Sequence, residues 1–210
     1  MLNTLRSRLK ALFTLSLLLM PLFAAAAIVE GEDYQVLAAK PAGSGAVLVR
    51  EFFSFGCPAC YRLEPTLQQW VKAEGKKIRF VRTPVIFRPA WEVYARAWYA
   101  SDTLGLSDAM APKLFAAVQD EKHPLESNAE MIAFFVENGV QKDVAESAFT
   151  HSTAMDMALG QSVARMSAAH INAVPAIVVG NRYKTDLQMA KSPERLLEVL
   201  DYLVKKAQTA

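Results

Sequence analysis

The chain's only two cysteines, Cys57 and Cys60, stand three positions apart where a strand pattern gives way to a helix pattern. Residues 47–55, VLVREFFSF, are rich in branched and aromatic side chains and follow the turn-like segment KPAGSG, which is typical of a buried strand. A helix is expected to begin at Cys57, because Pro58 suits the first helical position, where its missing N–H would be unpaired anyway. The pair is therefore expected at a strand-to-helix junction.

The helix that follows the cysteines is expected to end at Gly75. Pro65 lies inside it and is expected to bend it, because proline removes the hydrogen bond to the carbonyl of Tyr61. Residues 76–85, KKIRFVRTPV, then have the pattern of a second strand. The apolar stripe that defines the helix consists of Leu63, Leu67, Trp70 and Val71.

Residues 89–169 show helical signals alone. Their aromatic and methionine stripes are interpreted as core packing. Ser127 with Glu130 makes a capping box, and a long helix is expected over residues 153–169. This block therefore reads as a set of helices inserted between two groups of strands.

Strand signals return near the C-terminus. Gly180-Asn181 is expected to form the two-residue turn of a hairpin between strands 177–179 and 182–184. Ser192 then opens a terminal amphipathic helix. The order strand, helix, strand, helical block, hairpin and helix predicts an α/β fold.

The first 27 residues have the pattern of a secretory signal peptide. Arg6, Arg8 and Lys10 precede an apolar run over residues 11–23, which ends in alanines up to Ala27. A membrane anchor is the alternative, but the run is shorter than the roughly 20 apolar residues of a spanning helix. Cleavage is expected near Ala27, so the mature protein is expected in an oxidising, exported space.

Composition excludes one large class of partner. Of 23 Lys and Arg, three lie in the predicted signal peptide, so the mature part has 20 against 21 Asp and Glu. A near-neutral surface argues against nucleic-acid binding. The hydrophobic content of 52% is enough for a substantial core.

Exported cysteines usually form structural disulfides, but this pair is poorly placed for that use. A disulfide between Cys57 and Cys60 closes a very short loop and removes little entropy from the unfolded chain. A metal site is also disfavoured, because two thiolates supply half of a tetrahedral shell and the three histidines show no paired ligand spacing. The pair is therefore expected to be kept for redox chemistry.

The block EFFSFGCPACY, the helical insertion before VPA (residues 174–176) and the export signal together resemble the DsbA family of periplasmic thiol:disulfide oxidases, in the thioredoxin superfamily. The resemblance implies a thioredoxin fold with an inserted helical domain. The expected divisions are a signal peptide over residues 1–27, a thioredoxin-like domain over 28–88 and 170–210, and the helical insertion over 89–169.

The resemblance also implies an enzyme that needs neither cofactor nor metal. It would donate the Cys57–Cys60 disulfide to unfolded or folding exported proteins that carry cysteines. A membrane oxidase of the DsbB type would then recharge it. The location implied is the periplasm, and we expect a monomer.

The position of the cysteines assigns them different roles. Cys57 is at the helix N-terminus, where unpaired N–H groups and the helix dipole stabilise a thiolate and lower its pKa. It is therefore expected to be the reactive sulfur. Cys60 lies one turn further in and is expected to be the buried, resolving partner.

Glu51 is the candidate for proton transfer. It alternates in phase with Val47, Val49 and Phe53, which would bury its carboxylate beneath the cysteines. Burial raises the pKa of a carboxyl group and would let Glu51 exchange a proton with Cys60. The alternative is an exposed Glu51 paired with Arg50 or Arg79.

Pro175 resembles the cis-proline that faces the cysteine pair in this family. A proline offers no N–H, and Val174 before it would present backbone groups on which an extended substrate segment could pair as an added strand. The alternative is an edge-strand proline without a contact role. Phe55, Pro58 and Ala59 are the other residues expected to contact substrate.

Ala59 departs from the family pattern, which commonly has His between the proline and the second cysteine. A hydrogen-bond donor or positive charge beside Cys57 is therefore absent, which leaves the strength of oxidation open.

Three other functions remain open at this point. A reductase of the same fold differs from an oxidase in redox potential and membrane partner. The isomerases of this fold dimerise through a separate N-terminal domain, for which residues 28–46 are too few. A chaperone or binding module without catalysis would not need the intact cysteine pair.

Overall fold

A mixed β-sheet forms the centre of the molecule in the computed structural model, which describes residues 27–39, 45–121, 123–149 and 153–209. Within these residues the sheet has five strands in the order β1-β5-β4-β2-β3. The strands are β1 (Gln35–Val36), β2 (Val47–Phe53), β3 (Ile78–Pro84), β4 (Ala176–Val179) and β5 (Tyr183–Asp186).

The strand pairing is that of the thioredoxin fold, as the sequence predicts. The parallel strands β2 and β3 are joined by helix α2 (Pro58–Glu74) and the short η2 turn (Gly75–Lys77). Strand β4 pairs antiparallel with β2 on one side and with β5 on the other, and helix α9 (Pro193–Gln208) follows this hairpin after the short α8 (Leu187–Ala190). The central strand β2 therefore carries its C-terminal end directly to the cysteines.

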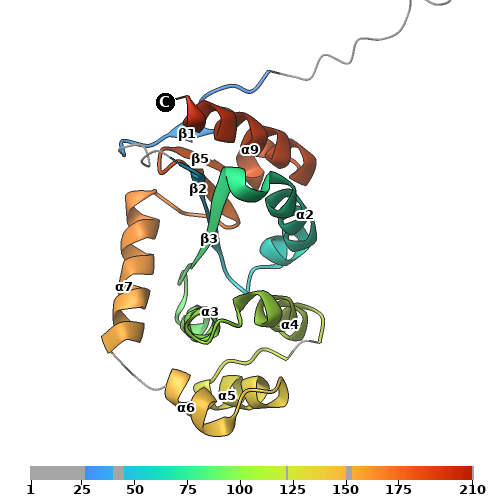
Figure 1. Ribbon diagram of the computed structural model, residues 1–210, viewed down its shortest axis with the longest axis vertical. Coiled ribbons are helices and arrows are strands. Elements are labelled where there is room, and N and C mark those ends of the chain that lie inside the picture. The colour runs from blue at the N-terminus through green and yellow to red at the C-terminus, as the bar shows by residue number, and fades with distance from the viewer. Residues whose placement is uncertain (1–26, 40–44, 122, 150–152, 210) are drawn as a thin grey trace, which may run out of the picture.

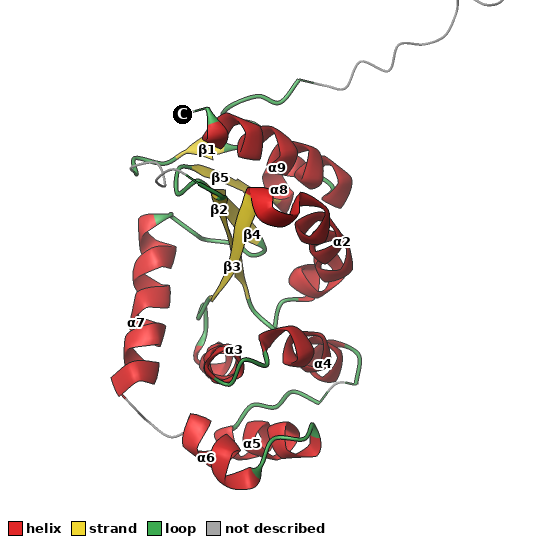
Figure 2. Ribbon diagram, viewed as in Figure 1, coloured by secondary structure: helices red, strands yellow, loops and turns green. Residues whose placement is uncertain are grey.

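Helices fill the chain between β3 and β4. Figures 1 and 2 show α2 and α9 on one side of the sheet, α7 on the other, and α3 to α6 gathered beyond one end of the strands. The inserted helical region that the sequence predicts is therefore present, while the limits proposed for it, residues 89–169, stay a prediction. Its elements are η3 (Pro89–Trp91), α3 (Glu92–Thr103), α4 (Ser107–Gln119), α5 (Asn128–Glu137), α6 (Lys142–Phe149) and α7 (Thr153–Ala168).

Two apolar cores hold these layers together. One lies between the sheet and helices α2 and α9, where Val49, Leu67 and Leu200 are fully buried. The other joins the sheet to the inserted helices through Phe53, Phe115 and their neighbours. The cysteine pair belongs to this second core, so the helical region forms part of its surroundings.

Helix ends follow the capping signals of the sequence. The Ser127 hydroxyl accepts from the Glu130 N–H at 3.2 Å, and the Glu130 carboxylate accepts from the Ser127 N–H at 3.0 Å, so the predicted capping box is confirmed. The Ser192 hydroxyl caps α9 in the same way. Helix α2 runs from Pro58 to Glu74 with Pro65 inside it, and the bend predicted there stays a prediction.

Strand limits differ from the sequence expectation in three places. Strand β2 ends at Phe53, because the chain turns directly after it, with Cys57 N donating to the Ser54 carbonyl. The second strand starts only after the η2 turn, at Ile78. In the hairpin, β4 begins at Ala176 and β5 runs from Tyr183 to Asp186, so three residues, 180–182, connect the strands where the sequence predicts two. Strand β1 was not predicted, because two residues are too few to show an alternating pattern.

No helix in the part of the chain that the structure describes is long and apolar enough to cross a membrane. The predicted signal peptide lies outside the described residues, except for residue 27.

Candidate active site

Cys57 occupies the N-cap position of α2, with extended backbone angles (φ −102°, ψ 109°) and Pro58 as the first helical residue. Its sulfur accepts a hydrogen bond from the Cys60 N–H at 3.2 Å, in the place where a capping serine oxygen would stand. Both cysteines are free thiols, so the structure represents the reduced state. The backbone N–H groups at the N-terminus of α2 therefore face the Cys57 sulfur.

The two thiols have opposite acidities. The pKa of Cys57 is lowered to about 7, first by the hydrogen bond from the Cys60 side chain and then, against the effect of burial, by the backbone N–H groups of Cys60 and Ala59. Burial raises the pKa of Cys60 far above its usual range, and the neighbouring Cys57 adds to this. At neutral pH only Cys57 has appreciable thiolate character.

The peptide bond between Val174 and Pro175 is cis, and the Cys57 thiol donates to the Val174 carbonyl at 3.4 Å across 117 positions of sequence. The fold thus brings the two predicted motifs together. Val174 is half-buried and Pro175 is buried, while Pro58 is exposed and Ala59 half-buried at the surface of the helix start.

Phe55 differs from the other residues predicted to contact substrate. Its side chain is 1% exposed and packs edge-on against Phe53 and Phe115, with ring centroids 5.2 and 4.9 Å away. A substrate cannot reach this ring, because the aromatic core already surrounds it. Phe55 therefore supports the cysteine loop from below.

Glu51 is fully buried on the central strand, and Arg82 of the neighbouring strand β3 is its ion-pair partner. Arg82 Nε lies 2.8 Å from Glu51 Oε2, and the guanidinium also contacts Glu64 of α2. Among the described residues, no donor other than Arg82 reaches the Glu51 carboxylate. The alternative pairing with Arg50 or Arg79 is therefore wrong: Arg50 donates to the Thr83 hydroxyl instead.

The charge state of Glu51 is set mainly by its burial, which raises the pKa of this carboxyl to about 7. Arg82 opposes the rise and Glu64 adds to it. In turn, the Glu51 charge raises the pKa of both cysteines, which shows that the three groups interact electrostatically. Glu51 can therefore exist in either protonation state near neutral pH.

Sequence reasoning missed Arg82, Glu64 and Gln119. Arg82 stands opposite Glu51 in the parallel register of β2 and β3, which a single sequence does not reveal. Gln119, at the end of α4, donates to the Phe55 carbonyl at 2.6 Å, and the Tyr61 hydroxyl of α2 donates to Asp120. These bonds attach the helical region to both sides of the cysteine loop.

Gly56, directly before Cys57, has no room for a side chain. A Cβ atom there would lie 2.5 Å from Trp91 Nε1 and 2.9 Å from a ring carbon of Tyr94. We expect Gly56→Ala to lower the free energy of unfolding of the reduced protein by about 1–3 kcal/mol through overpacking. Gly160→Ala, where nothing lies within 4 Å, is the matched control and should be neutral or stabilising by up to about 1 kcal/mol. Urea unfolding measures both, and equal effects would contradict the steric explanation.

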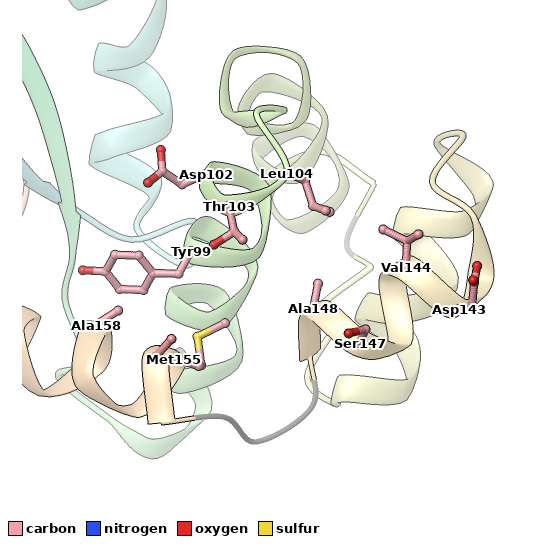
Figure 3. Close-up of a pocket in the computed structure, with 11 residues that line it drawn as sticks. Tyr99, Asp102, Thr103, Leu104, Asp143, Val144, Ser147, Ala148, Met155 and Ala158 are labelled. Atoms are coloured by element: carbon pink, nitrogen blue, oxygen red, sulfur yellow. The ribbon is translucent and has the colours of Figure 1, made fainter.

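A cavity of about 650 Å³ lies among α3, α6 and α7, lined by Tyr99, Leu104, Val144, Met155 and their neighbours (Figure 3). None of the residues predicted for the cysteine site lines it. This cavity is therefore not part of the proposed redox site.

The fold and the paired cysteines define a thiol:disulfide oxidoreductase of the thioredoxin class, and the comparisons with known proteins agree. A family model described as Thioredoxin matches residues 43–202. The thiol:disulfide interchange protein DsbA of Burkholderia cepacia is 35% identical over 186 residues, which are 87% of this chain and 87% of that protein. The chain belongs to the DsbA family.

Solved structures of this family have the same architecture. The crystal structure of Pseudomonas aeruginosa DsbA superposes with a TM-score of 0.81 at 29% identity, covering 87% of this chain and 95% of that one. A Proteus mirabilis DsbA variant, solved with a non-covalently bound peptide, gives 0.72 at 28% identity and covers 88% of this chain and 100% of that one. The protein is thus a thiol:disulfide oxidase that works through a mixed disulfide.

Proposed function

We propose that Cys57 is the sulfur that substrates attack and that Cys60 is the resolving cysteine. One observation carries this assignment: the Cys57 sulfur caps the helix and accepts the Cys60 N–H, and its pKa falls to about 7 while that of Cys60 rises. A stabilised thiolate is a good leaving group. The cysteine that leaves most easily is therefore the one bonded to substrate.

The proposed reaction transfers one disulfide. A substrate thiolate attacks the Cys57 sulfur, the Cys57–Cys60 bond breaks, and its electron pair goes to Cys60, which takes up a proton. A second substrate thiolate then attacks the substrate sulfur of the mixed disulfide and releases Cys57 as a thiolate. The substrate gains a disulfide and the protein is left as a dithiol.

Glu51 is proposed to supply the proton that Cys60 needs. A buried thiolate at Cys60 is costly, because its pKa is strongly raised. The Glu51 carboxyl has a pKa of about 7 and interacts with Cys60, so its protonated form is available near neutral pH. Arg82 and Glu64 would act as positioning residues for this carboxyl.

Val174 and Pro175 are proposed to form the binding edge for substrate. An extended segment would pair with the backbone of Val174 and bring its cysteine to Cys57, whose sulfur lies 3.4 Å from the Val174 carbonyl. Pro58 and Ala59 would contact the same segment from the helix side. The non-covalently bound peptide of the Proteus mirabilis relative supports the binding of a peptide by a protein of this family.

The partners proposed are exported proteins with unpaired cysteines, and a membrane oxidase of the DsbB type that restores the Cys57–Cys60 disulfide. The signal pattern ending near Ala27 supports a periplasmic location. We propose a monomer that does not bind nucleic acid. The reductase, isomerase and chaperone alternatives have less support, because the relatives found belong to the DsbA family.

The Cys60→Ser variant tests the assignment of the two cysteines. It should accumulate mixed disulfides with exported proteins, because Cys57 still reacts but Cys60 cannot resolve the product. Non-reducing gels of periplasmic extracts, followed by reduction of the adducts, would show them. Cys57→Ser is the matched control and should form none. Adducts on Cys57→Ser and none on Cys60→Ser would reverse the roles.

A further inference from the structure

A second hollow, of about 320 Å³, lies on the sheet face opposite α2 and α9. Side chains alternate along β2, so Val49 and Glu51 point towards α2 while Arg50 and Phe52 point to the other face. The C-terminal part of α7, seen beside the sheet in Figure 1, closes the hollow with Arg165. It is separate from the cysteine site, because none of the residues proposed for that site lines it.

The hollow carries positive charge without a carboxylate partner. Arg50 donates to the Thr83 hydroxyl at 2.8 Å and Arg165 to the Gln161 side-chain oxygen at 2.8 Å, both neutral groups. Neither arginine has an ion pair among the described residues, and the segments outside them contain no Asp or Glu. No carboxylate therefore balances the positive charges of the two guanidinium groups.

Electrostatics at Arg50 agree with this arrangement. Burial lowers the pKa of Arg50, and the positive charges of Arg165 and Arg79 lower it further. Asp102 and Asp108 line an adjoining cavity of about 370 Å³ that Arg165 also lines. Neither of them forms an ion pair with it in the described part of the chain. Negative charge is thus missing on the side of the hollow where Arg50 lies.

Apart from Asn181, the remaining wall is apolar. Leu37, Phe52, Ala169 and Val178 line it, and Phe52 and Val178 are almost completely buried. Guanidinium groups bind carboxylate and phosphate oxygens through paired N–H donors. An apolar wall beside them favours a ligand with an apolar body next to its charged head.

We propose that the hollow between β2, β4 and α7 is a binding site for a small amphipathic organic anion, with Arg50 and Arg165 on its carboxylate or phosphate head and Leu37, Phe52 and Val178 on its apolar part. The volume of about 320 Å³ suits a single ring or a short chain. The site is independent of the proposed redox mechanism, since it lies on the reverse face of the sheet.

Titration of the isotope-labelled protein with four probes, followed by amide NMR, tests the proposal. Phenylacetate and phenyl phosphate carry both parts of the ligand and separate a carboxylate from a phosphate head. Phenylacetamide keeps the shape of phenylacetate without its charge, and inorganic phosphate has no apolar part. We expect saturable shifts at Leu37 and Val178 with at least one of the two organic anions, and much weaker binding of the other two probes.

Variants connect that binding to the two arginines. Arg50→Met and Arg165→Met should each weaken binding of the organic anion about tenfold or more, because a charged hydrogen-bond pair is lost. Arg50→Lys keeps the charge and should retain more affinity than Arg50→Met. Arg62→Met, an exposed arginine of α2 outside the hollow, should bind as the unmodified protein does.

Four results would overturn the proposal. They are no saturable shift with either organic anion, binding of phenylacetamide as tight as that of the organic anion that binds, binding of inorganic phosphate as tight as that of the same organic anion, or the same loss in Arg62→Met as in Arg50→Met. Amide spectra of each variant without probe show whether the fold is kept, and Arg50→Lys supplies the comparison if Arg50→Met is unfolded.

Discussion

Replacing Arg82 by methionine is expected to lower the free energy of unfolding by about 3–5 kcal/mol above pH 7, because the buried Glu51 carboxylate loses its counter-charge. The Arg82 side chain is 5% exposed and that of Glu51 is 1% exposed, so water cannot replace the missing charge. Methionine keeps an apolar stem against Phe53, whose ring centroid lies 5.2 Å from the guanidinium carbon. Urea unfolding of the reduced variant measures the loss.

The pH dependence of that loss separates lost charge from lost packing. Without Arg82 the pKa of Glu51 should rise above its present value of about 7. Below pH 7 the Glu51 carboxyl is protonated in both proteins, so the loss of stability in the variant should shrink. Above pH 7 the carboxyl ionises in the unmodified protein, whereas in the variant its ionisation costs free energy, so the loss of stability should grow. Glu51→Gln combined with Arg82→Met should recover most of the stability. A loss that is the same at all pH values and in the double variant would contradict this explanation.

Glu51→Gln is expected to slow reduction of the oxidised protein by a dithiol about 100-fold, because Cys60 must then leave without an internal proton donor. The rate constant is divided by the fraction of attacking dithiol that is ionised and plotted against pH. In the oxidised protein neither cysteine titrates, so a change of slope, or bend, near pH 7 in this plot reports the titration of Glu51, whose pKa is about 7. The rate should be higher below the bend, where Glu51 carries its proton. Stopped-flow fluorescence across this pH range measures both quantities.

The matched control is Glu74→Gln, at the end of helix α2 away from the cysteines, where Glu74 pairs with Lys77 at the surface. It should keep both the rate and the bend. A Glu51→Gln variant with an unchanged rate and the same bend would remove Glu51 from the proton transfer.

Much of the fold could be predicted from local patterns. Three features each satisfy a local backbone requirement and can therefore be predicted from a single sequence. They are Pro58 at the helix start, the Ser127 capping box and the turn at Gly180. Strand β1 was not predicted, because its two residues pair with β5, nearly 150 positions away, and show no alternating pattern of their own. The end of β2 at Phe53 was not predicted, because the run of branched and aromatic residues continues to Phe55 while the chain already turns at Ser54, whose carbonyl accepts from Cys57 N.

In the site, too, local features could be predicted and features set by distant residues could not. The acidity of Cys57 depends on a helix terminus that the sequence marks, and the burial of Glu51 follows from alternation along one strand. The partner of Glu51 depends on the register between two strands, which placed Arg82 there instead of Arg50 or Arg79. The aromatic sequence around Phe55 indicates contact with something apolar, and only the packing shows that this is the core.

The central claim is that the Cys57 thiolate stabilises the reduced protein and thereby makes the disulfide oxidising. In the folded reduced form the pKa of Cys57 falls from 9.0 to about 7. This stabilisation is fully present above about pH 9, where it reaches about 3 kcal/mol, and it is lost as the pH falls through 7. The disulfide adds little stability to the oxidised form, because the loop that it closes is short.

Thermal unfolding of the reduced and oxidised proteins, compared over this pH range, measures the claim directly. We predict a higher melting temperature for the reduced form at pH 9, with a difference that shrinks as the pH falls from 9 to 7 and no longer changes appreciably below pH 7. By the thermodynamic cycle, such a protein must be an oxidant. An oxidised form that is the more stable at every pH, or a difference that does not change with pH, would contradict the account.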